Sequence, residues 1–116
     1  MQKLTITVGG KTFTATLTEQ PAARALADLL PLTLDMTELN GNEKYGMLPT
    51  ALPTQAERVG QIHAGDLMLY GSDCLVLFYK SFRSGYSYTR LGSLDDANGI
   101  AAAVGRGHVR ITIERA

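Results

Sequence analysis

The chain has one cysteine, no tryptophan and two histidines, and it contains no apolar run long enough to form a membrane-spanning helix. One cysteine excludes an internal disulfide framework, and two histidines are too few for a usual catalytic zinc site. Neither sign of charge is in excess, because 11 Lys and Arg residues balance 11 Asp and Glu residues. We therefore expect no metal, no cofactor, no nucleic-acid partner and no membrane partner.

The single thiol, Cys74, lies in the most apolar segment of the chain. Burial there would raise its pKa and leave it unreactive, so we expect a small core residue. The chain passes from Met1 directly into a strand pattern without an apolar leader, which favours a cytoplasmic protein. A chain from which a signal peptide had been removed would look the same.

With 116 residues, 45% of them hydrophobic, the chain can bury the core of one domain, residues 1–116. Its organising segment is a pair of near-continuous apolar runs, 66–70 and 74–79, joined by a Gly-Ser-Asp turn. A strand with one wet face would alternate apolar and polar residues, and these two runs do not. They predict a central antiparallel hairpin with two dry faces, followed by a looser strand over residues 86–91.

The periodicity of apolar residues predicts the other elements. An Ala and Leu stripe bounded by two prolines predicts a helix over residues 21–30. A second short helix, capped by Ser93 or Asp95, is expected to end at Gly105. Two-residue alternation and turn signals predict strands over residues 3–8, 12–17, 32–37, 44–48 and 109–114.

Two segments carry no regular pattern and are predicted to be loops. Residues 49–61 contain two prolines, and residues 80–85 connect two strands. The eight predicted strands fit a closed ring, and closure removes free sheet edges. The sequence therefore predicts a mainly β fold, a closed eight-stranded antiparallel β-barrel with two short capping helices.

This order of elements, together with several short motifs, resembles the cyclophilin-like fold. Gly71-Ser72 matches the Gly-Ser that opens a cyclophilin strand, and Leu-Gly-Ser-Leu at 91–94 looks like the Phe-Gly-x-Val of that family. The combination of residues 40–46, 64–71 and 86–88 is similar to a family of small bacterial cyclophilin-like proteins. That resemblance covers nearly the whole chain and implies a cyclophilin-like barrel of unassigned function.

The resemblance to true cyclophilins is shorter, and it lacks their catalytic pattern. Those enzymes isomerise prolyl bonds with an arginine on the third strand and a Phe-Met-x-Gln run on the fourth. The corresponding residues 32–36 and 44–47 read Leu-Thr-Leu-Asp-Met and Lys-Tyr-Gly-Met, without arginine. Lowering a barrier of about 20 kcal/mol needs a donor aimed at the twisting amide. We therefore expect no prolyl isomerase machinery.

An aromatic and basic cluster is the first candidate binding surface. Aromatic rings beside guanidinium groups can hold a peptide or a small planar or anionic ligand by stacking and hydrogen bonding. The alternative is that the tyrosines only pack and the charged residues belong to an ordinary solvated loop. The cluster comprises Tyr79, Lys80, Phe82, Arg83, Tyr86, Tyr88 and Arg90.

The turn around residues 40–45 is the second candidate, because it holds more hydrogen-bonding groups than a turn needs. Its candidate ligand-binding residues are Asn42, Glu43, Tyr45 and, one strand position further, Met47. The alternative is a solvated hairpin turn with a self-satisfied Asn side chain. If both candidates are real, they converge on one cleft.

No residue is predicted to be catalytic. His63 with Asp66 could form a metal or acid–base pair, but Asp66 is expected to anchor backbone groups where its strand begins. The serines lack a nucleophile elbow. We expect a non-catalytic module that binds a peptide segment or small ligand. The alternatives are an enzyme of unrecognised type using Glu43, His63 or a tyrosine, a residual prolyl isomerase, and a protein–protein interaction domain of unknown oligomeric state.

Overall fold

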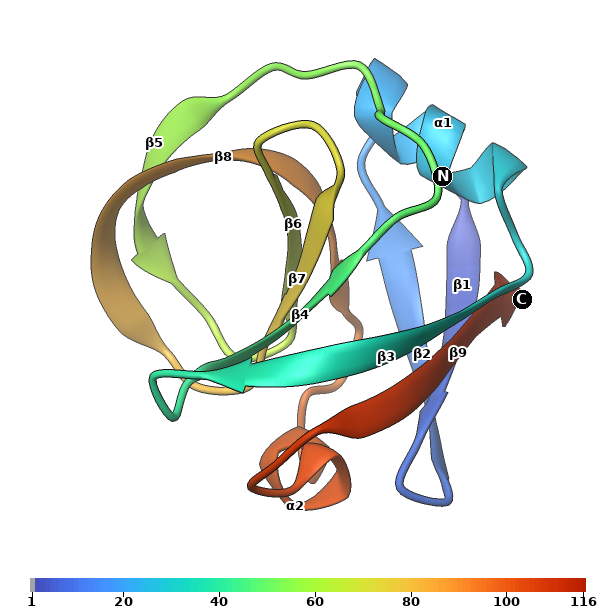
Figure 1. Ribbon diagram of the computed structural model, residues 1–116, viewed down its shortest axis with the longest axis vertical. Coiled ribbons are helices and arrows are strands. Elements are labelled where there is room, and N and C mark those ends of the chain that lie inside the picture. Colours follow the sequence, from blue (N-terminus) through green and yellow to red (C-terminus); the bar gives the residue numbers. More distant parts are fainter. Residues whose placement is uncertain (1) are drawn as a thin grey trace.

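A computed structural model describes residues 2–116 of the chain (Figure 1). Antiparallel strands and two short helices account for most of the described residues, so the predicted mainly β class is confirmed. In chain order the elements are β1 (Lys3–Val8), β2 (Lys11–Leu17), α1 (Pro21–Asp28), β3 (Leu32–Leu39), β4 (Glu43–Met47), β5 (Glu57–Ile62), β6 (Asp66–Tyr70), β7 (Cys74–Phe78), β8 (Phe82–Leu94), α2 (Ile100–Val104) and β9 (Val109–Arg115).

The first hairpin shows how alternation becomes structure. Leu4 lies opposite Ala15 and Ile6 lies opposite Phe13, and all four side chains are buried on the same face of the sheet. The threonines between them face the other way. Burying a Leu, Ile or Phe side chain contributes about 1.5–3 kcal/mol, and a slip of one residue would expose the whole set. The hydrophobic pattern therefore fixes the register of this hairpin.

Eight strands form a hydrogen-bonded ring in the order β2-β1-β9-β3-β4-β7-β6-β8, and the pairing of β8 with β2 closes it. Closure depends on Gly92, which lies opposite Leu17. A Cβ atom on Gly92 would collide with the Thr16 carbonyl oxygen and would lie 3.0 Å from the Leu17 Cα. Only a glycine lets the two backbones approach this closely.

β8 is the longest strand, and its two halves have different partners. Residues 89–94 pair with β6 and β2 in the ring, whereas residues 82–88 pair with β5. Both pairings contain a register shift at which β8 holds one extra residue, and such bulges bend a strand. In Figure 1, β5 and the adjoining half of β8 arch away from β6 and β7 as a two-stranded ribbon.

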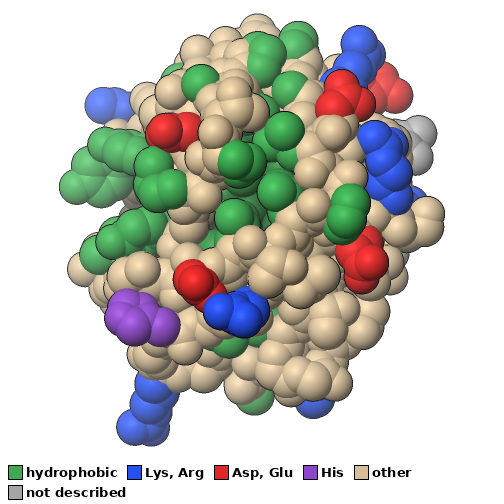
Figure 2. Space-filling view, turned by 45° about the vertical axis from the view of Figure 1, so that its right-hand side comes forward, with side chains coloured by type: hydrophobic (Ala, Val, Ile, Leu, Met, Phe, Trp, Pro, Cys, Tyr) green, Lys and Arg blue, Asp and Glu red, His purple; other side chains and the backbone are tan. Residues whose placement is uncertain are grey.

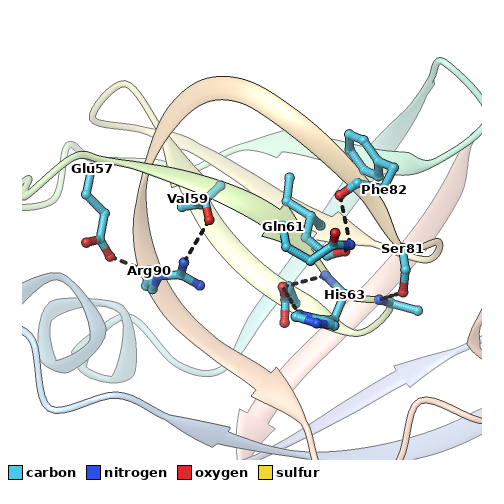
Figure 3. Close-up of polar contacts among 10 residues, drawn as sticks. Glu57, Val59, Gln61, His63, Ser81, Phe82 and Arg90 are labelled. Atoms are coloured by element: carbon cyan, nitrogen blue, oxygen red, sulfur yellow. Dashed lines mark hydrogen bonds and ion pairs between the residues drawn. The ribbon is translucent and has the colours of Figure 1, made fainter.

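The ninth strand corrects the prediction of a loop over residues 49–61. β5 forms there because Val59 and Ile62 are buried beneath the ribbon. The predicted loop at 80–85 is likewise shorter, since β8 already begins at Phe82. Figure 3 shows Arg90 holding the ribbon: its Nε lies 2.9 Å from a carboxylate oxygen of Glu57. The same guanidinium donates to the Val59 carbonyl oxygen at 3.4 Å.

The two short helices, α1 and α2, both occur near the predicted positions. α1 ends at Asp28, two residues earlier than predicted, and it buries Ala22, Ala23, Leu26 and Ala27. Of the predicted stripe, Ala22 and Leu26 are buried, and Ala25, Leu29 and Leu30 are partly buried against the core. The prediction that Ser93 or Asp95 caps the second helix is wrong, because Ser93 still belongs to β8. The Asp95 carboxylate instead accepts hydrogen bonds from Lys3 and Thr16. α2 begins at Ile100, without a side-chain cap.

The buried side chains form two clusters on opposite sides of the β6–β7 hairpin. Leu67, Leu69, Leu75 and Leu77 face the larger cluster inside the ring. The residues that alternate with them face a smaller cluster outside, which comprises Val59, Ile62, Met68, Val76, Phe78 and Tyr88. The predicted hairpin with two dry faces is therefore confirmed, and the β5–β8 ribbon covers its outer face.

The surface agrees with the balanced composition. Figure 2 shows a band of hydrophobic side chains down the middle of one face, with charged side chains of both signs around it. That face carries no broad region of one charge. Among residues 2–116, no helix combines the length and the apolar character needed to cross a membrane.

Candidate functional site

A pocket lies outside the ring, where three neighbouring strands turn their outer side chains toward the ribbon. Tyr45 of β4 lies opposite Val76 of β7. On the other side of β7, Tyr70 of β6 lies opposite Cys74. Side chains two residues apart on a strand share a face, so Glu43 projects on the same side as Tyr45. This register gathers two tyrosines, a thiol and a carboxyl group on one wall.

The ribbon supplies the facing wall. Tyr86 and Tyr88 are two residues apart in β8, and the Tyr70 ring centroid lies 6.4 Å from the first ring and 5.7 Å from the second. Tyr70 and Tyr86 meet edge to face, with 87° between their planes. The walls enclose an open cavity of about 320 Å³. It is lined by Leu39, Asn40, Glu43, Tyr45, Tyr70, Cys74, Val76, Tyr86 and Tyr88, which we call the tyrosine pocket.

Glu43 is the one charged side chain among the described residues that line the tyrosine pocket. Its residue is 7% exposed, and none of residues 2–116 hydrogen-bonds to its carboxyl group or forms an ion pair with it. Burial, and to a smaller degree the charge of Glu38, raises its pKa. Burial also raises the pKa of Tyr88 and Cys74, and the Glu43 charge adds to both shifts. The pocket is therefore a site of unbalanced negative charge.

The other side of β4 presents the opposite case. Lys44 is fully buried, and its Nζ donates to Glu38 at 3.0 Å and to the carbonyl oxygens of Gly105 and Gly107 at 2.9 and 2.6 Å. It also lies 5.4 Å from the centroid of the Tyr79 ring. This network ties β4 to the segment between α2 and β9. Because all three ammonium hydrogens are engaged, Lys44 is a structural residue.

Tyr79 belongs to the Lys44 network and not to the tyrosine pocket. Its hydroxyl donates to Glu38 at 2.6 Å, and burial together with this bond raises the pKa of Tyr79 to about 12. Burial alone would raise the pKa of Glu38, but hydrogen bonds from Tyr79, Lys44 and the Gly41 N–H outweigh it and lower that pKa. Tyr79 is therefore held as a neutral donor inside the fold.

The two predicted surfaces meet in part. Glu43, Tyr45, Tyr86 and Tyr88 line one pocket. Met47 is 56% exposed at the far end of β4 and does not line it. Phe82 packs on Phe78 in the outer cluster, with 5.7 Å between ring centroids. The basic residues Lys80, Arg83 and Arg90 do not line the pocket either, so the predicted pairing of rings with guanidinium groups is absent there.

Asn42 lies beside the pocket in the β3–β4 turn. Its carbonyl oxygen accepts the Tyr79 N–H at 3.0 Å. Its side-chain Oδ1 is buried and has no hydrogen-bond partner among residues 2–116. The turn is closed by Glu38, whose carboxylate accepts the Gly41 N–H at 2.7 Å. A turn with a self-satisfied Asn side chain is therefore not what forms.

The pocket includes Asn40 of the predicted turn, and sequence reasoning missed Leu39, Tyr70, Cys74 and Val76. The prediction that Cys74 is a core residue is wrong, because its side chain is half-buried on the wall of the tyrosine pocket. The available signal was positional: Tyr70 and Cys74 flank the tight turn between β6 and β7 and face each other in the register. Tyr70 stands at the end of an apolar strand, and in the structure it is 50% exposed at the edge of the tyrosine pocket.

The histidine alternatives lie elsewhere. Asp66 accepts the backbone N–H of His63 at 2.9 Å, so its expected anchoring role is confirmed. The two side chains are 3.9 Å apart, and that of His63 is 70% exposed outside the tyrosine pocket. Residues 2–116 contain no group of three or more His, Cys, Asp or Glu side chains placed to hold a metal ion.

Comparison with known proteins supports the fold. A sequence profile described as that of the cyclophilin-like family matches residues 6–114. The solution structure of a hypothetical protein from Archaeoglobus fulgidus is similar, with a TM-score of 0.74 over 99% of this chain and 95% of that chain. The two sequences are 19% identical, so this likeness concerns the fold alone. A search of curated proteins finds no match.

Proposed function

The chain belongs to the cyclophilin-like family, and on that premise we propose that it is a non-catalytic binding module built on a cyclophilin-like barrel. Its binding site is the tyrosine pocket, outside the ring and beneath the β5–β8 ribbon. The pocket takes a small molecule or one side chain of a peptide.

The observation that carries this proposal is the convergence of Tyr45, Tyr70, Tyr86 and Tyr88 on one cavity from three strands. Tyr45, Tyr70 and Tyr86 are left partly exposed and Tyr88 is buried behind them. Aromatic side chains around a concavity are typical of ligand sites, since each offers an apolar face and a polar edge. The cavity, at about 320 Å³, lies at the lower end of the usual range for small-molecule sites. A ligand of this size is a single ring or a branched alkyl group.

The chemistry of the pocket favours binding over catalysis. Acid–base catalysis needs a donor and an acceptor placed on the reacting atoms, and nucleophilic catalysis needs an activated nucleophile. Cys74 has a raised pKa and so remains a thiol at neutral pH. The segments 32–36 and 44–47 also lack the arginine of a prolyl isomerase.

The proposal is tested by NMR titration with benzyltrimethylammonium, benzyl alcohol and benzoate, three small probes that share a phenyl ring and differ in charge. At least one should give saturable shifts confined to residues around Tyr70, Tyr86 and Tyr88. Tyr86→Ala should abolish them, and Met47→Ala, which removes an exposed side chain outside the pocket, should not. Saturable shifts from none of the three probes would contradict the proposal.

Catalysis has its own test. Exchange spectroscopy on an Ala-Pro peptide should show the same cis–trans rate with and without the protein. Faster exchange would replace the binding module with a residual prolyl isomerase.

A further inference from the structure

We propose that the group bound in the tyrosine pocket is a cation, namely an alkylated ammonium group held between the Glu43 carboxylate and the tyrosine rings. This inference rests on the proposed binding function and specifies the chemistry of its ligand.

The first argument is charge. Glu43 is 7% exposed and has no donor or counter-charge among residues 2–116, and its carboxyl oxygens keep contact with solvent only where they face the tyrosine pocket. Buried charges in proteins are normally paired, because an isolated one loses its hydration without compensation. The other described residues on the pocket wall are four phenols, a thiol, an amide and two aliphatic side chains. A bound cation would supply the missing partner.

The second argument is the arrangement of the rings. Cations bind over aromatic faces, and quaternary ammonium groups are recognised by several faces turned toward one point. The edge-to-face contact of Tyr70 with Tyr86 places their planes at 87°, and Tyr88 is inclined by 59° to Tyr70. Rings inclined in this way turn their faces in different directions; Tyr70 and Tyr86 are the exposed ones, whereas Tyr88 is 4% exposed and also meets the Phe78 ring at 90°. Flat stacking on a planar ligand would instead require parallel rings.

The third argument excludes an anion. No Lys or Arg is among the described residues lining the pocket. The Arg90 guanidinium is bound to Glu57, and Lys44 donates its three hydrogens on the opposite side of β4. An anion entering the pocket would therefore meet Glu43 without a compensating positive charge.

The fourth argument, that the bound ammonium group is alkylated, rests on the apolar side chains of the pocket wall. Val76, Leu39 and Cys74 offer apolar contact and few acceptors, so a bare ammonium ion would lose more hydration than the pocket returns. A trimethylammonium group spreads its charge over methyl groups that pack against such a surface. It can come from a free small molecule or from a trimethylated lysine in a peptide.

The decisive probes are choline and 3,3-dimethyl-1-butanol, which have the same shape but differ by the replacement of a positive nitrogen with a neutral carbon. In calorimetric and NMR titrations we expect choline to bind about tenfold more tightly or better. Glu43→Gln, which keeps the shape of the side chain, should remove that preference and leave binding of the alcohol unchanged. Glu114→Gln makes the same charge change on an exposed residue of β9 and should have no effect.

Tyr86→Leu provides a second variant, because Tyr86 is 66% exposed and its loss costs the fold little. It should weaken choline binding more than binding of the alcohol. If a peptide that contains trimethyl-lysine binds more tightly than choline, the natural ligand is a protein side chain. If choline binds more tightly than the peptide, the natural ligand is a small molecule.

Equal binding of choline and the alcohol, or a preference for choline that survives Glu43→Gln, would contradict the proposal that the ligand is a cation but not the proposal that the protein is a binding module. Binding of neither compound would also contradict the proposal that the ligand is a cation. The benzyl series then decides the fate of the module by itself.

Discussion

The side chains buried inside the ring and those buried outside it differ in how completely they are covered. The inner cluster joins residues from Leu4 to Ile113, and its hydrophobic side chains are enclosed by the whole sheet. The outer cluster has one cover, the β5–β8 ribbon, and its margin is left open with tyrosines and a carboxyl group. The inner side therefore forms the larger core, and the outer side combines a smaller core beneath the ribbon with the groups that line the tyrosine pocket.

Two adjacent residues of β4 show this difference at single-residue scale. Lys44 is fully buried with three hydrogen-bond acceptors, and Glu43 is nearly as buried with no donor among the described residues. The fold has satisfied one charge and left the other without a partner. Substitutions on the two sides should consequently differ in the size and even the sign of their effect on stability.

The largest effect is expected for Lys44→Met. Removing the ammonium leaves the carbonyl oxygens of Gly105 and Gly107 without this donor and Glu38 without its cation. Breaking such a network costs about 3 kcal/mol or more of unfolding free energy. Urea unfolding measures it, with Lys80→Met as the control for an exposed lysine. A loss below about 1 kcal/mol would remove the contrast with Glu43.

A smaller loss is expected for Gly92→Ala, which tests closure of the ring. The added Cβ collides with the Thr16 carbonyl oxygen, so β2 and β8 must separate. Overpacking of this kind costs about 1–3 kcal/mol. Gly85→Ala places a Cβ in open space on the ribbon half of the same strand and should change unfolding free energy by less than about 0.5 kcal/mol. Equal losses for the two variants would mean that closure is not where β8 is constrained.

The smallest effect, and one of opposite sign, is expected for Glu43→Gln. Because the folded pKa of Glu43 is raised above its usual value of 4.5, the folded state holds this proton more tightly than the unfolded state does. The wild-type protein therefore loses stability as the pH rises from the unfolded pKa through the folded one. The variant lacks this loss and should be equal to wild type in acid and more stable at neutral pH, by about 1 kcal/mol or less.

Urea titrations of wild type, Glu43→Gln and Glu114→Gln between pH 3.5 and 8 would show this crossover. Glu38 and Asp95 have lowered pKa values and make all three proteins less stable in acid, so only the difference between variants is informative. A Glu43→Gln protein that is less stable at neutral pH would reveal a partner that stabilises the carboxylate within the folded chain.

Much of the ring could be predicted because its signal is local. Alternation in segments such as Leu4–Ile6–Val8 fixes which face is buried without reference to distant residues. β5 could not be predicted, because Gly60 interrupts its pattern and its burial depends on β8, whose paired residues lie at least twenty positions later. The bulges that bend β8 are also products of tertiary pairing.

The residues of the candidate site likewise fall into those visible from local sequence and those brought in by tertiary pairing. Glu43 and Tyr45, or Tyr86 and Tyr88, are visible as pairs within one strand, and the sequence identified them. Tyr70 and Cys74 join them only through the register of β6, β7 and β4, which no short window of sequence contains. Arg83 is close to Tyr86 in sequence but does not line the pocket, because the strand carries it away along the ribbon.

The most direct test of the central claim is a ¹³C NMR titration of the Glu43 carboxyl group, with and without choline. Glu38 is the other carboxyl group whose charge acts on Glu43, so its ¹³C signal must be followed in the same titration. We expect a pKa above 4.5 in the free protein and a marked decrease when choline is bound. A pKa that choline leaves unchanged would contradict the account.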